Sequence, residues 1–514
     1  MKQRPERLEK LYIVLLSTLF FILLPFAASV ICGDQMSSGF HLLANNPVKT
    51  NNNPIKDTLR AKSIGSIDSN LCPCSDESLG CKNSPLNTQK AKELKSDRVV
   101  VDEPYVRFED YSEENMLASI VDRLSRAKNS DRGVRFAFLG DSFIEADIFT
   151  ADIREQLQSH FGGRGVGFVP VASVASGYRT TVTLSSSGWR SFSMLDSRRA
   201  DWRKLMFSGF YFIPQEGAVL SVKPGRRKDQ LVPTSMARFF FINEKNTQIK
   251  AVINDSIVKT YSPRSSNELQ SIDLDGEISS VKLTFSSVNG FVGYGIYLND
   301  EKGVYVDNYS VRGYSGVTLS SINADLSKRF DQLLPNDVII LQYGLNVAGV
   351  NVTNYTNYKR RMISVINTLK GYFPNTAFIV MSVSDRAVRT NNQYETIPGI
   401  ISMVNVQREI ARETGIIFWD TFTAMGGKNS MLQFVAHKPP LASKDYTHIN
   451  YAGGKRIAEI FVNSLLKEVN KPKPQMLIAH KPKGIQLTDS LRSAAAFSNP
   501  LFYLRNAIFS TSEN

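Results

Sequence analysis

Cysteine, histidine and tryptophan are scarce in this chain of 514 residues, which contains four, five and three of them. Three of the cysteines, Cys72, Cys74 and Cys81, lie in one short segment with no histidine nearby, so the paired ligand spacing of a zinc site is missing. The body of the chain beyond this segment contains no cysteine. We therefore expect no metal site, and a local disulfide formed in an oxidising compartment is the simpler interpretation.

Basic residues are numerous, but they are not gathered into a patch. The 61 lysines and arginines exceed the 48 aspartates and glutamates, and the formal net charge is +13. A nucleic-acid-binding module places its basic residues on one element beside aromatic residues that stack on bases, and that arrangement is missing here. We expect no nucleic-acid partner, because scattered positive charge suits an anionic envelope polymer or a membrane face better.

A nucleotide-binding loop is missing as well. The glycine-rich residues 162–167 come after a predicted helix, and no Lys-Ser or Lys-Thr pair follows them, whereas a phosphate-binding loop follows a strand and continues with such a pair. We expect these glycines to shape the wall of a crevice. No cofactor is predicted.

One long apolar run stands at the N-terminus. Four lysines and arginines precede the almost unbroken apolar residues 11–31. This length approaches the roughly 20 residues that span a bilayer and exceeds the apolar core of a usual signal peptide, about 7–15 residues. Residues 1–32 are therefore predicted to be a signal peptide or a membrane anchor, with the length favouring the anchor. Either one predicts export to the periplasm or cell envelope.

The segments that flank the central part of the chain have no sustained apolar period. Residues 33–103 are rich in Asn, Ser, Lys and Pro and are expected to form a flexible tether that holds the protein away from the cytoplasmic membrane. Residues 470–514 form a basic tail to which the sequence assigns no role.

Alternating apolar strands and amphipathic helices predict an α/β domain. Strands are predicted at 134–139, 338–343, 377–383 and 416–419, and helices at 112–130, 151–161, 355–372, 398–414 and 452–469. Such alternation implies a parallel sheet covered by helices. The expected fold class is a three-layer α/β/α domain, whose two parts are residues 104–176 and 308–469.

Between these two parts the pattern changes to short strands separated by Gly, Pro, Asn and Asp. Alternating apolar residues occur at 218–222, 237–242, 249–253, 281–285 and 291–298. We therefore predict that residues 177–307 form an inserted all-β sandwich domain.

Gly140-Asp141-Ser142 directly follows the predicted buried strand at 134–139. Parallel-sheet proteins keep their active sites just beyond the carboxyl ends of the strands. Glycine permits a tight turn there, and Ser142 would be placed to attack, with its own backbone N–H free to donate to an oxyanion. The tripeptide also occurs as an ordinary turn, so it needs partners elsewhere in the chain.

Asp445 and His448 lie three residues apart, immediately before the last predicted helix. A carboxylate at this spacing can hold an imidazole in the tautomer that a serine nucleophile requires. His437 is the one serious rival for the role of base. The alternative for the pair is a surface loop in which Asp445 only caps the helix.

Acyl transfer also needs hydrogen-bond donors for the oxyanion. Asn346 follows the predicted strand at 338–343, so its amide could point into the same crevice, and Gly316 could offer a backbone N–H. Asn and Gly are also the commonest turn residues, so Asn346 and Gly316 could each simply form a turn.

Taken in order, these four blocks resemble those of the SGNH, or GDSL-like, hydrolases, which are named after Ser, Gly, Asn and His. The resemblance implies Ser142 as nucleophile, with His448 as base and Asp445 as its orienter. It also implies an oxyanion hole made by the N–H groups of Ser142 and Gly316 and the amide of Asn346. Many members have Asp after the Asn, whereas this chain has Val347.

Residues 149–168 and 313–319 and the β insert resemble peptidoglycan O-acetylesterases that carry a carbohydrate-binding-like β domain. The likeness covers residues 104–469. It implies an exported serine esterase that removes O-acetyl groups from peptidoglycan or a related acetylated polysaccharide through an acetyl-enzyme. Exposed aromatic residues of the insert, with Tyr211 and Tyr294 as candidates, could stack on sugar rings, while the more common alternative for such residues is a place in the core.

Two other functions remain open at this point. The same residues would serve an envelope polysaccharide O-acetyltransferase, because access of water to the acetyl-enzyme decides between hydrolysis and transfer. A non-catalytic protein that binds glycan through the β insert is the third possibility, and the presence of all three triad residues argues against it.

Overall fold

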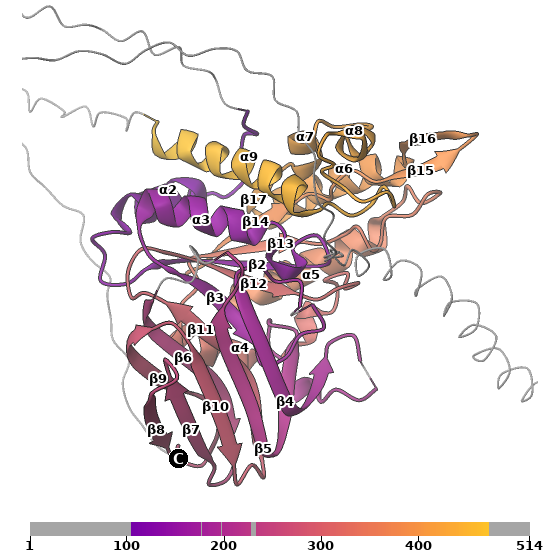
Figure 1. Cartoon of the computed structure of the whole chain (residues 1–514). Coiled ribbons are helices and arrows are strands. Elements are labelled where there is room, and N and C mark those ends of the chain that lie inside the picture. The colour runs from indigo at the N-terminus through magenta and orange to yellow at the C-terminus, as the bar shows by residue number, and fades with distance from the viewer. Residues whose placement is uncertain (1–103, 176, 197, 228–232, 472–514) are drawn as a thin grey trace, which may run out of the picture. The chain divides into compact units, whose positions relative to one another are not determined.

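The computed structural model describes residues 104–175, 177–196, 198–227 and 233–471 of the chain (Figure 1). The predicted anchor, the tether, all four cysteines and all but the first two residues of the tail lie outside these ranges. Within the described ranges, no helix is both long enough and apolar enough to cross a membrane.

Six strands form a mostly parallel sheet. They are β1 (Glu109–Asp110), β2 (Val134–Gly140), β12 (Val304–Ser310), β13 (Val338–Gln342), β14 (Ala377–Met381) and β17 (Ile417–Trp419). Their order in space is β1-β17-β14-β13-β2-β12, and all neighbours are parallel except β1 and β17. The four predicted strands of the α/β part are confirmed, and β1 and β12 are additional strands.

Helices cover both faces of this sheet because apolar side chains alternate along each strand. In β2, Phe136 and Phe138 join one core cluster, whereas Ala137 and Leu139 join the other. The first cluster includes side chains of α2 (Met116–Arg126), α3 (Thr150–Phe161) and α9 (Tyr451–Val469), and the second includes those of α4 (Ala324–Leu333), α5 (Thr356–Tyr372) and α6 (Pro398–Thr414). Two short helices, α7 (Thr421–Met425) and α8 (Ser430–Ala436), follow β17.

The ends of the helices carry the signals that their residues predict. Asn115 accepts the N–H of Ala118 at the start of α2, and Ser112 accepts the N–H of Met116. Helix α6 begins with Pro398, whose fixed φ suits the first helical position, and ends at Gly415 with a φ of 58°. The predicted helices at 151–161, 355–372, 398–414 and 452–469 are confirmed to within one residue at each end.

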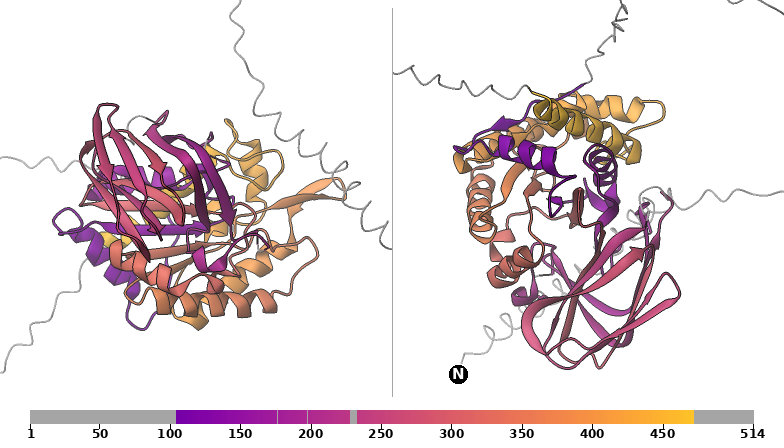
Figure 2. Two further views of the ribbon diagram at one scale, coloured as in Figure 1. Left: turned by 90° about the horizontal axis from the view of Figure 1, so that it is seen from below. Right: turned by 90° about the vertical axis from the view of Figure 1, so that its left-hand side faces the viewer.

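Nine antiparallel strands form the second sheet. They are β3 (Gly165–Pro170), β4 (Val182–Ser193), β5 (Phe210–Pro224), β6 (Thr234–Asn243), β7 (Gln248–Ile253), β8 (Ile257–Tyr261), β9 (Ser266–Ile278), β10 (Val281–Ser286) and β11 (Phe291–Asn299). The main order is β8-β7-β10-β5-β11-β6-β9, while β4 pairs with β5 and β3 with β11. This single connected sheet, curved in Figure 2, differs from the two-sheet sandwich expected from the sequence.

The chain crosses from one sheet to the other at residues that differ from the predicted boundaries, 177 and 307. Strand β3, residues 165–170, already pairs with β11, and β12, residues 304–310, pairs with β2 of the parallel sheet. The difference arises because β12 is apolar and short, and nothing in its local pattern distinguishes a strand of the insert from a strand of the parallel sheet.

One apolar core joins the two sheets. Phe168 and Tyr297 of the nine-stranded sheet pack in the same cluster as Tyr309 of β12 and Phe330 of α4, and the rings of Tyr297 and Phe330 are in contact. The nine-stranded sheet is therefore attached to the α/β part through a shared core.

The predicted sugar-stacking role of Tyr211 and Tyr294 is wrong. Both rings lie in this shared core, with exposed fractions of 2% and 0%. The Tyr294 hydroxyl donates to the carbonyl of Lys204 at 3.0 Å, and the Tyr211 hydroxyl accepts the N–H of Asp201 at 2.8 Å. Each buried hydroxyl thus has a protein partner and is not available to a ligand.

Candidate active site

The register of the parallel sheet brings three of the four sequence blocks to one edge. Gly140 at the end of β2 pairs with Gln342 of β13 on one side and with Ser310 of β12 on the other. Gly344-Leu345-Asn346 follows the first of these neighbours, and Gly316 follows the second. Parallel strands end at the same edge of a sheet, so the nucleophile block lies between the two blocks predicted to supply oxyanion donors.

The turn after β2 requires a glycine and is closed by the aspartate of the block. A Cβ atom on Gly140 would lie 3.0 Å from the carbonyl oxygen of Gln342 and 2.9 Å from Ile144. The buried carboxylate of Asp141 accepts the N–H of Phe143 at 3.0 Å. Ser142 is partly exposed, and neither its hydroxyl nor its backbone N–H has a hydrogen-bond partner among the described residues.

Asn346 connects the nucleophile block to the Gly316 block. Its amide nitrogen donates to Asp141 Oδ2 at 2.9 Å and to the carbonyl of Tyr314 at 3.3 Å. Gly316 itself has a φ of 82°, and a Cβ atom there would lie 2.7 Å from the ring of Tyr343, so no other residue fits. In the described part of the chain its N–H donates to no protein acceptor.

Asp445 and His448 form a hydrogen-bonded pair in the loop before α9. The ring Nδ1 of His448 lies 2.6 Å from Asp445 Oδ2, and the backbone N–H of His448 donates to Asp445 Oδ1 at 3.0 Å. Burial raises the pKa of Asp445, but the hydrogen bonds from His448 and Thr447 outweigh it and bring the pKa to about 2. The carboxylate is therefore ionised at every pH at which an esterase would work.

His448 lies near the nucleophile block, because the hydroxyl of Tyr451, three residues further on, donates to the carbonyl of Ala146 at 3.5 Å in the loop after Ser142. Burial raises the pKa of Asp141 to about 6, while the N–H of Phe143, the charge of His448 and the amide of Asn346 act in the opposite direction. The structure thus brings all four blocks together. It records no hydrogen bond between the Ser142 hydroxyl and His448, a contact that in enzymes without substrate is often long.

His437 does not lie in a comparable setting. It follows α8, its side chain is exposed, and its Nδ1 lies 2.7 Å from the carbonyl of Pro439. Its recorded hydrogen-bond partner is a carbonyl rather than a carboxylate, so the ring lacks the acidic partner that orients a catalytic histidine.

Three ion pairs that the sequence did not indicate hold the loop after Ser142. Glu145 is nearly buried and forms an ion pair with Arg312, which lies between β12 and Gly316. Asp147, fully buried and with a φ of 62°, accepts hydrogen bonds from Arg154 and Arg179. Their positive charges lower the pKa of Asp147 in spite of its burial. These residues are too far apart in sequence for any local motif to reveal their pairing.

No group of three or more His, Cys, Asp or Glu side chains within the described ranges could hold a metal ion. The arrangement instead offers a partly exposed hydroxyl, an imidazole bonded to a carboxylate, two unused backbone N–H groups and a side-chain amide. This combination suits nucleophilic acyl transfer.

No model of a known protein family matches the chain, and no curated protein matches it by sequence. Its fold is found among solved ester hydrolases. The structure is similar to that of a peptidoglycan O-acetylesterase, with a TM-score of 0.59 and 21% identity over 71% of this chain and 99% of the other. The resemblance found in the sequence is thereby confirmed at the level of the fold.

Two further matches are much weaker. A family two carbohydrate esterase from Cellvibrio japonicus has a TM-score of 0.24 and 9% identity over 56% of this chain and 98% of its own. An acetyl xylan esterase has a TM-score of 0.22 and 15% identity over 30% of this chain and 79% of its own. Likeness at this level adds nothing to the comparison above.

Proposed function

We propose that this protein is a serine esterase of the SGNH type that removes O-acetyl groups from peptidoglycan or a related envelope polysaccharide. The observation that carries the proposal is the position of Asn346, whose amide contacts both Asp141 and Tyr314 and so places the second and third blocks around Ser142. The Asp445–His448 pair supplies the base. The shared fold with a peptidoglycan O-acetylesterase supports the choice of substrate.

The reaction proceeds in two steps. His448 takes the proton of the Ser142 hydroxyl while Oγ bonds to the acetyl carbon, and the carbonyl oxygen becomes an oxyanion. As the intermediate collapses, the ester bond breaks and His448 gives its proton to the departing sugar oxygen. A water molecule, deprotonated by His448, then attacks the acetyl-enzyme, and acetate leaves as Ser142 regains its proton.

The oxyanion is stabilised by the N–H groups of Ser142 and Gly316 and by the amide of Asn346. The two backbone donors are unused in the described structure, so they lose no protein hydrogen bond when the oxyanion forms. Asn346 keeps its 2.9 Å bond to Asp141 and exchanges the longer 3.3 Å bond to the Tyr314 carbonyl for one to the oxyanion.

The architecture proposed with this function is a three-layer hydrolase domain that carries the β sheet as an insert. Export through residues 1–32 would bring the protein to its polymer in the envelope.

Acetate release from O-acetylated peptidoglycan tests the proposal. Ser142→Ala should lower kcat by about a thousandfold or more, as loss of a triad nucleophile does in other hydrolases. The free energy of unfolding should change little, because the Ser142 side chain has no partner among the described residues. Ser187→Ala, a change at an exposed serine of β4, is the matched control.

Near-normal hydrolysis by Ser142→Ala would exclude this mechanism. Acetyl transfer to an added glycan, without acetate release, would reassign the same residues to a transferase.

A further inference from the structure

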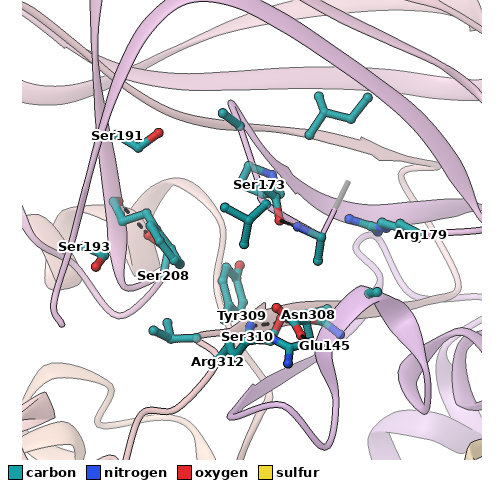
Figure 3. Close-up of a pocket in the computed structure, with 18 of the residues that line it drawn as sticks. Glu145, Ser173, Arg179, Ser191, Ser193, Ser208, Asn308, Tyr309, Ser310 and Arg312 are labelled. Carbon is teal, nitrogen blue, oxygen red and sulfur yellow. Dashed lines mark hydrogen bonds and ion pairs between the residues drawn. The ribbon is translucent and has the colours of Figure 1, made fainter. Parts of the chain in front are cut away.

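The Asn346 block is held in place differently from the other two blocks around Ser142. The ion pair of Glu145 with Arg312, drawn in Figure 3, ties the segment after Ser142 to the segment before Gly316. Residues 343–348 contain no charged side chain. The position of the Asn346 amide must therefore be set by hydrogen bonds and packing.

A glutamine side chain separates the ends of β13 and β14. The two strands pair in parallel up to Gln342 and Met381. If this ladder continued, the carbonyl of Tyr343 would face the N–H of Val383. Instead, the amide nitrogen of Gln407 in α6 donates to the Tyr343 carbonyl at 2.6 Å, and its amide oxygen accepts the Val383 N–H at 2.8 Å. One side-chain amide thus lies between two backbone groups that would otherwise bond to each other.

The amide of Gln407 is held in one orientation. The residue is only 2% exposed, and the hydroxyl of Tyr358 on α5 also forms a hydrogen bond with its side chain. If the amide turned by 180°, its NH2 group would meet the Val383 N–H and its oxygen would meet the Tyr343 carbonyl. Buried polar groups left without partners cost about 1–3 kcal/mol each, so the amide acts as a fixed spacer.

The spacing of the strand ends is transmitted to Asn346 through a short turn. Gly344 has a φ of 114°, and a Cβ atom there would lie 2.9 Å from the amide nitrogen of Gln407, so the backbone passes directly beside the spacer. The Gly344 carbonyl accepts the N–H of Val347 at 2.9 Å, which closes the turn that contains Asn346. From this turn the Asn346 amide reaches Asp141 Oδ2 at 2.9 Å.

We infer that Gln407 is a positioning residue of the active site, which keeps the ends of β13 and β14 apart so that the amide of Asn346 reaches the oxyanion. The inference rests on the proposed function for the role of Asn346. Gln407 acts through the backbone of the two strands, without contact with the substrate. A displacement of about 1 Å at a catalytic group can cost about a hundredfold in rate, so a spacer of this kind affects turnover directly.

Gln407→Ala tests the inference because it removes the spacer. The Tyr343 carbonyl and the Val383 N–H can then bond to each other, which draws the following turn toward β14. Thr414→Val is the matched control, since Thr414 is buried at the other end of the same helix and its hydroxyl donates to the Ile410 carbonyl at 2.7 Å. Both changes remove buried hydrogen bonds from α6, and only the first one lies beside the Asn346 block.

Steady-state kinetics on p-nitrophenyl acetate give the first measurement. Gln407→Ala should lower kcat by at least about tenfold with little change in KM, whereas Thr414→Val should leave kcat within about twofold. Asn346→Ala should lower kcat by about a hundredfold or more, as loss of an oxyanion donor does. In that background Gln407→Ala should lower kcat by less than about threefold more, because the group that it positions is already gone.

Crystal structures of the full chain and of the two helix variants give a second measurement that needs no turnover. The distance from the Asn346 amide nitrogen to Asp141 Oδ2 is 2.9 Å in the wild type. It should exceed the hydrogen-bond limit of about 3.5 Å in Gln407→Ala and stay unchanged in Thr414→Val. If Gln407→Ala does not fold, Gln407→Met takes its place in both measurements, since its flexible side chain fills the space without an amide.

The inference is overturned if Gln407→Ala keeps the kcat of the wild type or changes KM alone. It is also overturned if the losses of Gln407→Ala and Asn346→Ala multiply in the double variant, or if the bond between Asn346 and Asp141 survives in Gln407→Ala. A wild type that hydrolyses neither acetylated peptidoglycan nor p-nitrophenyl acetate would remove the proposed function instead. The distance between Asn346 and Asp141 would then still decide whether Gln407 positions the amide.

Discussion

At the scale of single residues, His448 is held at two points by one carboxylate. Asp445 Oδ1 accepts the backbone N–H of His448, and Asp445 Oδ2 lies within hydrogen-bond distance of its ring Nδ1. Such a contact fixes the tautomer and orientation of the ring and stabilises the imidazolium that forms during catalysis.

His448→Ala should therefore lower kcat for p-nitrophenyl acetate by about a thousandfold or more, since the nucleophile loses its base. His437→Ala should leave kcat within twofold, because that ring contacts a carbonyl outside the site. Hydrolysis assays on the two purified variants measure both effects. If His437→Ala lost its activity and His448→Ala kept it, His437 would be the base.

Asp141 should make the stability of the protein depend on pH. Its pKa in the folded protein is about 6 against an ordinary 3.8, so the folded state holds a proton that the unfolded chain has released between these values. Stability therefore falls as pH rises from about 4 to about 6, and the full effect corresponds to roughly 3 kcal/mol.

Asp141→Asn removes this titration. Relative to the wild type, the variant should gain as much as about 3 kcal/mol in unfolding free energy between pH 4 and pH 7, whatever its stability at pH 4. Urea denaturation at both pH values measures the difference. If the difference in unfolding free energy between variant and wild type did not change with pH, the pKa of Asp141 would be an ordinary one.

At the scale of secondary-structure elements, a hairpin contacts the loop that carries Asp445 and His448. Strands β15 (Ala387–Thr390) and β16 (Gln393–Thr396) form it, and Figure 1 shows it extending away from the parallel sheet. The ring of Tyr394 stacks on that of Tyr446, with 3.8 Å between centroids, and the N–H of Ala387 donates to the Tyr446 carbonyl.

Tyr446 stands between Asp445 and His448 and has a φ of 54°, a strained value for a bulky residue. The stack and the backbone bond hold it in that conformation. An aromatic pair contributes about 0.5–1.5 kcal/mol, which sets the size of the effect expected when the pair is lost.

Tyr394→Ala should lower kcat by up to about tenfold with little change in KM, because the Asp445–His448 loop becomes less well ordered. Tyr394→Phe keeps the ring and should behave like the wild type. Steady-state kinetics on a small ester separate the two parameters. An effect on KM alone would make Tyr394 a substrate contact, and equal losses in both variants would assign the effect to the hydroxyl group.

At the scale of the whole described molecule, the two sheets share a core and should unfold together. Phe168, Tyr297, Tyr309 and Phe330 pack across the boundary between the sheets. For this reason, replacing residues 177–307 by a linker would not isolate the insert. That deletion also removes the first four residues of β12, including Asp307, whose buried carboxylate accepts a hydrogen bond from Arg135 at 2.7 Å.

Tryptophan fluorescence can test this cooperativity. Trp189 lies in β4 and Trp419 in β17, so each reports on one sheet. Two variants, each of which lacks Trp202 and keeps only one of these two tryptophans, should each show the same denaturation midpoint by fluorescence and by circular dichroism. A midpoint for Trp189 that differs from the circular dichroism of the same variant would show that the nine-stranded sheet unfolds separately.

The local sequence determined four strands and five helices of the α/β part and the order of the blocks that carry Ser142, Gly316, Asn346 and His448. These features depend on apolar period, turn residues and sequence spacing, which act over a few residues and can be read without the fold. Export, the anchor and the tether also come from the sequence, and they stay predictions.

Tertiary structure alone decided the rest. It placed Tyr211 and Tyr294 in the core, assigned β3 and β12 to different sheets, paired Glu145 with Arg312, and stacked Tyr394 on Tyr446. The physical reason is that burial and pairing depend on contacts between residues far apart in the chain. An exposed and a buried tyrosine can have the same local sequence pattern, and only the packing of the two sheets distinguishes them.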